Sequence, residues 1–82
     1  MVKRPVYARD QKVIKFIAKR VKELRLENGW TQEELANEAE IGIAQLKRIE
    51  TATVNTSVSS IYRISKALKV NIDTLLNGVD KI

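Results

Sequence analysis

Two adjacent basic residues, Lys47 and Arg48, offer the most informative hydrogen-bonding chemistry in this sequence. They lie in TQEELANEAEIGIAQLKRIE, residues 31–50, which looks like two short helices around a tight turn. At about 100° per residue, Leu46 and Ile49 fall on one side of the second helix and the two basic residues on the other. The first side would hold the helix in a core, and the second would stay available for a partner.

The outward side of this helix also carries apolar residues. Ile43 and Ala44 lie on it, and Gln45 lies near its boundary. In a DNA major groove, an arginine suits guanine O6 and N7, a lysine can reach a base or a phosphate, and small apolar groups pack on thymine methyl groups. A helix anchored on one side and free on the other has the layout of a helix-turn-helix.

Catalytic chemistry is poorly supported. The chain has no cysteine and no histidine, which removes thiolate and imidazole chemistry and the usual transition-metal ligands. Tyr62 and Lys66 show a Y-x-x-x-K spacing used by some dehydrogenases, but no glycine-rich dinucleotide turn accompanies it, so we interpret it as accidental. We therefore expect neither an enzyme nor a metal or cofactor site.

Charge is distributed unevenly along the chain. The net charge is +5, with a pI near 9.8, which suggests a polyanionic partner. Residues 1–28 hold nine basic and three acidic residues, whereas residues 29–52 hold two basic and five acidic residues. The basic excess thus favours the N-terminal segment, and not the acidic motif, as the part that contacts a polyanion. Its lysines form either a solvated face or a surface for DNA or another partner.

A long first helix is expected at residues 10–28, after a basic N-terminal arm at residues 1–9. Asp10 is a plausible N-cap, and Gly29 would end the helix with a positive φ. Four apolar residues recur at helical spacing and are expected to face the core: Ile14, Ile17, Val21 and Leu24. Phe16 and Leu26 fall off that face and would be peripheral packing or a contact surface.

The second helix is expected to start with a capping box, in which Thr31 and Glu34 each accept a backbone N–H. Three small or apolar residues are expected to pack inward from this helix and its following turn: Leu35, Ala39 and Ile41, with Ala36 allowing close helix approach. Gly42 is expected to supply an unusual backbone geometry at the start of the third helix, residues 43–50.

Two more helices complete the expected domain. Ser57 would cap a fourth helix after a polar connection at residues 51–56, and Asn71 would cap a short fifth helix that Gly78 interrupts. The residues of the fourth helix expected to pack inward are Val58, Ile61, Ile64 and Leu68. The apolar residues of the fifth also follow helical spacing: Ile72, Leu75, Leu76 and Val79. These patterns predict an all-α, compact five-helix domain at residues 10–82.

The run RVKELRLENGWTQEELANEAEIGIAQLKRIE, followed by IYRISKALKVNIDTLL, resembles the Cro/phage-repressor type (XRE-like) helix-turn-helix family. The resemblance covers about residues 18–76 and rests on several separated elements at the right spacing. It departs from the family at Glu40, where relatives often carry glycine, at Gly42, where they often carry a polar cap, and at residues 51–56, which lack Lys and Arg.

The resemblance implies roles for matching positions. Gln32 is similar to the glutamine that binds a DNA phosphate, and Arg25 and Glu50 to a structural ion pair joining the first and third helices. Trp30 stands where relatives pack a large apolar residue. The residues that we expect to contact DNA are Thr31, Gln32, Gly42, Ile43, Ala44, Gln45, Lys47, Arg48, Asn55 and Thr56. For Lys47 and Arg48 the alternative is a solvated face, and for Ile43 it is packing at the helix edge or on another subunit.

We therefore expect a cytoplasmic transcription regulator that binds double-stranded DNA as a homodimer on a palindromic site. The expected dimer surface is apolar and C-terminal: Leu76, Val79 and Ile82. The alternative is a protein-interaction module, such as an antitoxin that masks a toxin, with DNA binding secondary. The acidic motif and the apolar start of its outward helix favour that alternative somewhat. No membrane-spanning run is present in the sequence.

Overall fold

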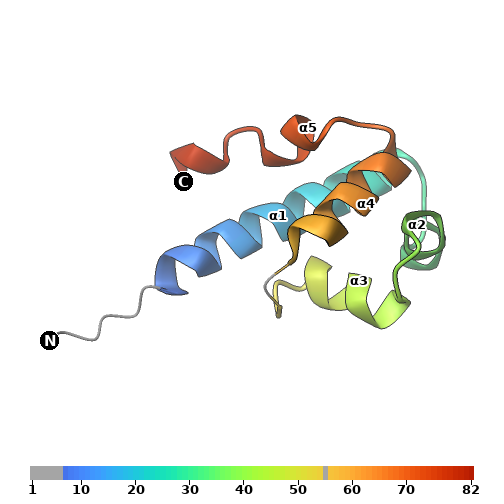
Figure 1. The fold of residues 1–82 in the computed structure, drawn as a ribbon, viewed down its shortest axis with the longest axis horizontal. Coiled ribbons are helices and arrows are strands. Elements are labelled where there is room, and N and C mark those ends of the chain that lie inside the picture. Colours follow the sequence, from blue (N-terminus) through green and yellow to red (C-terminus); the bar gives the residue numbers. More distant parts are fainter. Residues whose placement is uncertain (1–6, 55) are drawn as a thin grey trace, which may run out of the picture.

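A computed structural model describes residues 7–54 and 56–82, and these residues form helices and no strand. Five α-helices are followed by a short 3₁₀ helix: α1 (Tyr7–Glu27), α2 (Gln32–Ala39), α3 (Ile43–Glu50), α4 (Val58–Leu68), α5 (Ile72–Leu76) and η1 (Val79–Lys81). The predicted all-α, five-helix class is confirmed. In Figure 1, α1 runs along the long axis of the molecule, and its N-terminal half extends past α3.

The core lies where α1, α2, α3 and α4 meet. Its fully buried side chains come from all these helices and from α5: Val21, Leu35, Leu46, Ile49, Ile64 and Leu75. The small residues Ala36 and Ala39 are buried between α2 and α4, which lets these two helices approach closely. Trp30 packs against this cluster as a partly buried side chain, in agreement with the expected packing role.

Helix α1 begins at Tyr7, earlier than expected, so Asp10 lies inside the helix and is not its N-cap. Residues 1–6 of the expected arm lie outside the described residues. Ile17, Val21 and Leu24 are buried as expected, and Phe16 packs at the periphery of the core, one of the two roles expected for it. Ile14 was expected in the core but is half-buried and outside the core cluster. The segment after α5 contributes to the packing of Phe16, because Gly78 lies next to the Phe16 ring.

Local signals set the start of α2 and α4. Thr31 and Glu34 form both hydrogen bonds of the capping box, and the Ser57 hydroxyl accepts from the Ser60 backbone N–H at 3.1 Å. Val58 was expected to pack inward, but it is 77% exposed. Helical side chains point toward the N-terminus of their helix, so the first residue of α4 extends beyond the core.

The C-terminal segment is less regular than expected. Helix α5 ends at Leu76, Asn71 makes no side-chain cap hydrogen bond, and Gly78 adopts a φ of 92° before η1. Arg20 ties this segment to α1, because its Nη2 donates to the Thr74 carbonyl at 2.8 Å. In the part of the chain that the structure describes, no helix combines the length and apolarity that crossing a membrane requires.

Candidate nucleic-acid interface

Helix α3 separates its anchored side from its free side. Leu46 and Ile49 are buried, whereas four residues on the other side are exposed: Ile43, Ala44, Lys47 and Arg48. The basic side chains of Lys47 and Arg48 form no ion pair with any residue in the described ranges. An exposed helix face with two unengaged cations and two apolar groups can enter a groove and contact both base edges and methyl groups.

The end of α3 is fixed by a buried ion pair. Arg25 on α1 donates from Nε to Glu50 Oε2 at 2.8 Å and from Nη2 to Glu50 Oε1 at 3.1 Å. The two side chains are only 9% and 3% exposed. Arg25 Nη1 also donates to the Trp30 carbonyl at 2.8 Å. The pair suggested by the resemblance is thus present, and it joins α1, the α1–α2 connection and α3.

Gln32 belongs to the same network. Its Nε2 donates to Glu50 Oε1 at 3.1 Å, a contact that sequence reasoning missed because the two residues are 18 positions apart with no local signal. A carboxamide nitrogen carries two hydrogens, so the second N–H of Gln32 remains a donor for a phosphate. The hydrogen bond to Glu50 holds that donor at the start of α2.

The turn between α2 and α3 differs from expectation. Gly42, the N-cap of α3, has an ordinary extended backbone with φ −71° and ψ 147°, so its special flexibility is not used. The left-handed position is Glu40, with φ 58°, where it caps α2. Ile41 is half-buried against the core instead of fully buried. The turn is therefore held by a strained non-glycine residue and lacks a side-chain cap on α3.

Gln45 does not point freely outward. Its Nε2 donates to Ser60 Oγ at 2.8 Å, and that hydroxyl also accepts from Ser57 Oγ at 3.0 Å. Gln45 therefore links α3 to the start of α4. The sequence placed Gln45 at the boundary of the outward face, but nothing in the spacing identified Ser60 as its partner.

The connection between α3 and α4 is compact at its start. Thr51 Oγ1 donates to the Lys47 carbonyl at 2.8 Å, and Thr53 Oγ1 donates to the Arg48 carbonyl at 3.2 Å. These threonines satisfy carbonyls that the end of a helix leaves free. Thr56 is half-buried, and Asn55 lies outside the described residues.

The acidic residues of α2 need not face a nucleic acid. Glu33, Glu34 and Glu38 are exposed, and the first two lie in the first turn of α2, where the helix dipole favours carboxylates. The negative charge of Glu33 and Glu34 thus has a local structural role.

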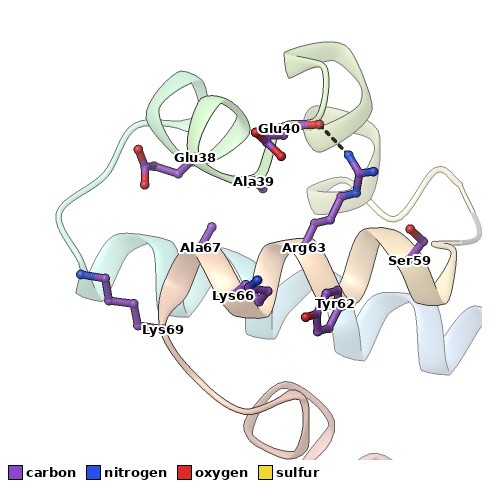
Figure 2. A pocket seen from close by; sticks show the side chains of 9 residues that line it. All are labelled: Glu38, Ala39, Glu40, Ser59, Tyr62, Arg63, Lys66, Ala67 and Lys69. Atoms are coloured by element: carbon purple, nitrogen blue, oxygen red, sulfur yellow. Dashed lines mark hydrogen bonds between the residues drawn. The ribbon is translucent and has the colours of Figure 1, made fainter.

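A separate groove lies between α2 and α4, with a volume of about 510 Å³. Figure 2 shows the charged and aromatic side chains along its walls, with Arg63 Nη1 donating to the Glu40 carbonyl at 3.1 Å. Lys66 Nζ lies 5.5 Å from the centre of the Tyr62 ring, a cation–π contact. This groove contains none of the residues expected to bind DNA. No group of metal-ligating side chains occurs among the described residues.

The expected dimer residues differ in exposure. Leu76 is half-buried and packs against the core, and Val79 is also half-buried. Ile82 is 52% exposed. The expectation that all three are exposed is therefore wrong, because the chain after α5 folds back along α1.

Comparison with known proteins points to one family. A model of the helix-turn-helix family matches residues 21–75. The chain is 34% identical over 71 residues to an uncharacterised HTH-type transcriptional regulator of Rickettsia conorii, covering 87% of this chain and 57% of that protein. It is 34% identical over 55 residues to the antitoxin HipB of Escherichia coli, covering 67% of this chain and 58% of HipB. The chain thus spans little more than half the length of these relatives.

Comparison with solved structures also finds proteins with a similar fold. The restriction–modification controller protein C.AhdI from Aeromonas hydrophila matches with a TM-score of 0.74 and 26% identity. The match covers 76% of this chain and 94% of the controller protein. The shared part therefore accounts for nearly the whole controller protein, while part of this chain lies outside it.

Proposed function

The chain belongs to the helix-turn-helix family of DNA-binding transcriptional regulators, and from this premise we propose that it binds a palindromic operator as a homodimer. The outward face of α3 would enter the major groove. One observation carries the proposal: the buried Arg25–Glu50 pair fixes α3 while the opposite face of that helix stays exposed.

Base recognition is assigned to the outward residues of α3. Arg48 pairs with guanine O6 and N7, Lys47 reaches a base or a phosphate, and Ile43 and Ala44 pack on thymine methyl groups. Gln45 sits at the edge of this face, held by Ser60. The operator should therefore hold thymines under the start of each reading helix. Replacing these thymines by uracil removes only the methyl groups, and unchanged affinity would refute the assignment.

Phosphate contacts are assigned to the flanks of α3. Gln32 offers its free N–H, Thr31 its hydroxyl and Gly42 its backbone. Asn55 and Thr56 are assigned further phosphate contacts from the sequence alone. Such contacts fix the position of a protein on DNA, whereas base contacts supply the specificity. The hydrogen bond between Gln32 and Glu50 supports this assignment, because it orients the amide at 3.1 Å.

A dimer would place two reading helices in successive major grooves, about 34 Å apart. We assign its interface to the C-terminal segment, where Ile82 is exposed and Val79 is half-buried. Leu76 would contribute through its remaining exposed part. Sedimentation at high micromolar concentration tests the interface, since a monomer there would overturn it.

The decisive test is a fluorescence-anisotropy titration with DNA from immediately upstream of the gene and a shuffled duplex of equal length. A sequence-specific regulator should prefer the upstream DNA by about a thousandfold or more near physiological salt. Equal weak binding to both duplexes would reject an operator at that place.

A second candidate function is antitoxin activity through a protein partner, and two observations favour it. The antitoxin HipB is among the relatives, and the helix-turn-helix itself carries an excess of acidic residues. Coexpression with the product of an adjacent gene tests this function. Growth rescue together with a stable complex would support it, whereas neither effect would remove it.

A further inference from the structure

Four lysines form a continuous strip on α1: Lys12, Lys15, Lys19 and Lys22. All four are exposed. At about 100° per residue they fall within about 80° of each other, on the side opposite the buried Ile17 and Val21. We call this strip the lysine ridge.

Most of the lysine ridge lies ahead of the segment that the family model matches. The family model starts at residue 21, whereas α1 already begins at Tyr7. The added turns are nevertheless held against the domain, because Phe16 and Ile17 pack on the core and Arg20 donates to the Thr74 carbonyl. The ridge is thus carried on a helix fixed to the domain, not on a loose tail.

The charges of the ridge are not neutralised by the fold. Among the described residues, none of its lysines forms an ion pair, and Glu23 instead contacts Arg20 at 3.5 Å. Like charges three or four residues apart on a helix repel each other. An external polyanion would relieve this repulsion.

The length of the ridge matches a stretch of nucleic-acid backbone. Ten residues of helix span about 15 Å, which corresponds to about four nucleotide steps of one strand. Helix α1 packs against α3, and its N-terminal half extends past α3 along the long axis (Figure 1). The N-terminal half of α1 therefore carries Lys12 and Lys15 beyond α3.

We propose that the lysine ridge binds the sugar–phosphate backbone of the duplex, beside the segment read by α3, and so adds sequence-independent affinity. The proposal rests on the proposed function, because it assigns a second DNA contact to the same complex. It also accounts for the absence of Lys and Arg from residues 51–56, since basic contacts are supplied by α1 instead.

The test compares two variants of equal charge. The ridge variant carries Lys12→Gln, Lys15→Gln and Lys19→Gln. The control variant carries changes on other exposed lysines: Lys66→Gln, Lys69→Gln and Lys81→Gln. Each variant lowers the net charge from +5 by three, and glutamine forms helix nearly as well as lysine. Circular dichroism should show the same helix content in both.

The readout is binding to the shuffled and upstream duplexes at several salt concentrations. Each lost phosphate contact should reduce the slope of log K against log[salt] by about 0.9, so the ridge variant should lose up to about 2.7. Its affinity would then fall up to a few hundredfold at 0.1 M salt and converge with the wild type near 1 M. The control variant should lose less than about 1 in slope. Lys→Arg at the three ridge positions should restore the wild-type slope.

Equal slopes for the ridge and control variants would overturn the proposal, because net charge alone would then explain the loss. Failure of the proposed function would give another result, because the wild type would then bind upstream and shuffled DNA equally. In that case the salt dependence of binding to the shuffled duplex still tests the ridge. Loss of discrimination without loss of slope in the ridge variant would also contradict the proposal.

Discussion

Replacing Glu50 by alanine tests how the reading helix is held. The Glu50 carboxylate accepts hydrogen bonds from Arg25 Nε, Arg25 Nη2 and Gln32 Nε2, at 2.8, 3.1 and 3.1 Å. Glu50→Ala removes all three at once. The Arg25 guanidinium, 9% exposed, would keep only the Trp30 carbonyl as an acceptor. The variant therefore leaves a cation buried without its counter-charge.

The cost follows from that unpaired charge. Breaking a buried ion pair by removing one partner costs about 3–5 kcal/mol. A domain of this length has a total stability of roughly 4–12 kcal/mol, so the variant should lose a large fraction of it. Glu50→Gln keeps the shape and one acceptor oxygen, and it should cost less than Glu50→Ala.

Urea unfolding followed by circular dichroism measures these changes. The double variant Arg25→Met with Glu50→Leu replaces the pair by apolar side chains. Its loss should be smaller, by about 2 kcal/mol, than the sum of the losses of Arg25→Met alone and Glu50→Leu alone. A Glu50→Ala cost below about 1 kcal/mol, the value of an exposed ion pair, would refute the reasoning. Additive losses in the double variant would do the same.

Three further outcomes are expected. Glu40→Gly should raise the free energy of unfolding by about 1 kcal/mol, because Glu40 holds a φ of 58°; a loss in urea unfolding would contradict this. Gly42→Ser should add roughly a few tenths of a kcal/mol, since the N-cap of α3 has a suitable backbone, no side-chain cap and nothing within 4 Å of an added Cβ; no gain in thermal unfolding would count against it. Arg48→Ala should leave stability within about 0.5 kcal/mol but reduce the preference for upstream over shuffled DNA by about 1–3 kcal/mol, and an unchanged preference by anisotropy would remove its reading role.

Local patterns in the sequence predicted much of the fold. The capping box of Thr31 and Glu34 and the division of α3 into a buried and an exposed side depend on residues close together in the chain. Periodicity and capping reflect the geometry of one helix, so they can be recognised without knowing its neighbours. The candidate reading face was predicted by the same means.

Features that depend on distant segments were not predicted. Phe16 packs against the core beside Gly78, which is 62 positions away in the sequence, and Leu76 also packs against the core. The hydrogen bonds from Gln32 to Glu50 and from Gln45 to Ser60 join residues 18 and 15 positions apart. No helical period relates such residues, so only the folded arrangement shows that they meet.

The division of α3 also has a consequence for changing what the domain recognises. Its four outward side chains, Ile43, Ala44, Lys47 and Arg48, are exposed, whereas Leu46, Ile49 and Glu50 hold the helix in place. Substitutions at exposed positions usually change stability by no more than about 0.5 kcal/mol. A library randomised at the four outward positions should therefore consist mostly of folded proteins, which makes this helix a starting point for selecting binders of new DNA sequences.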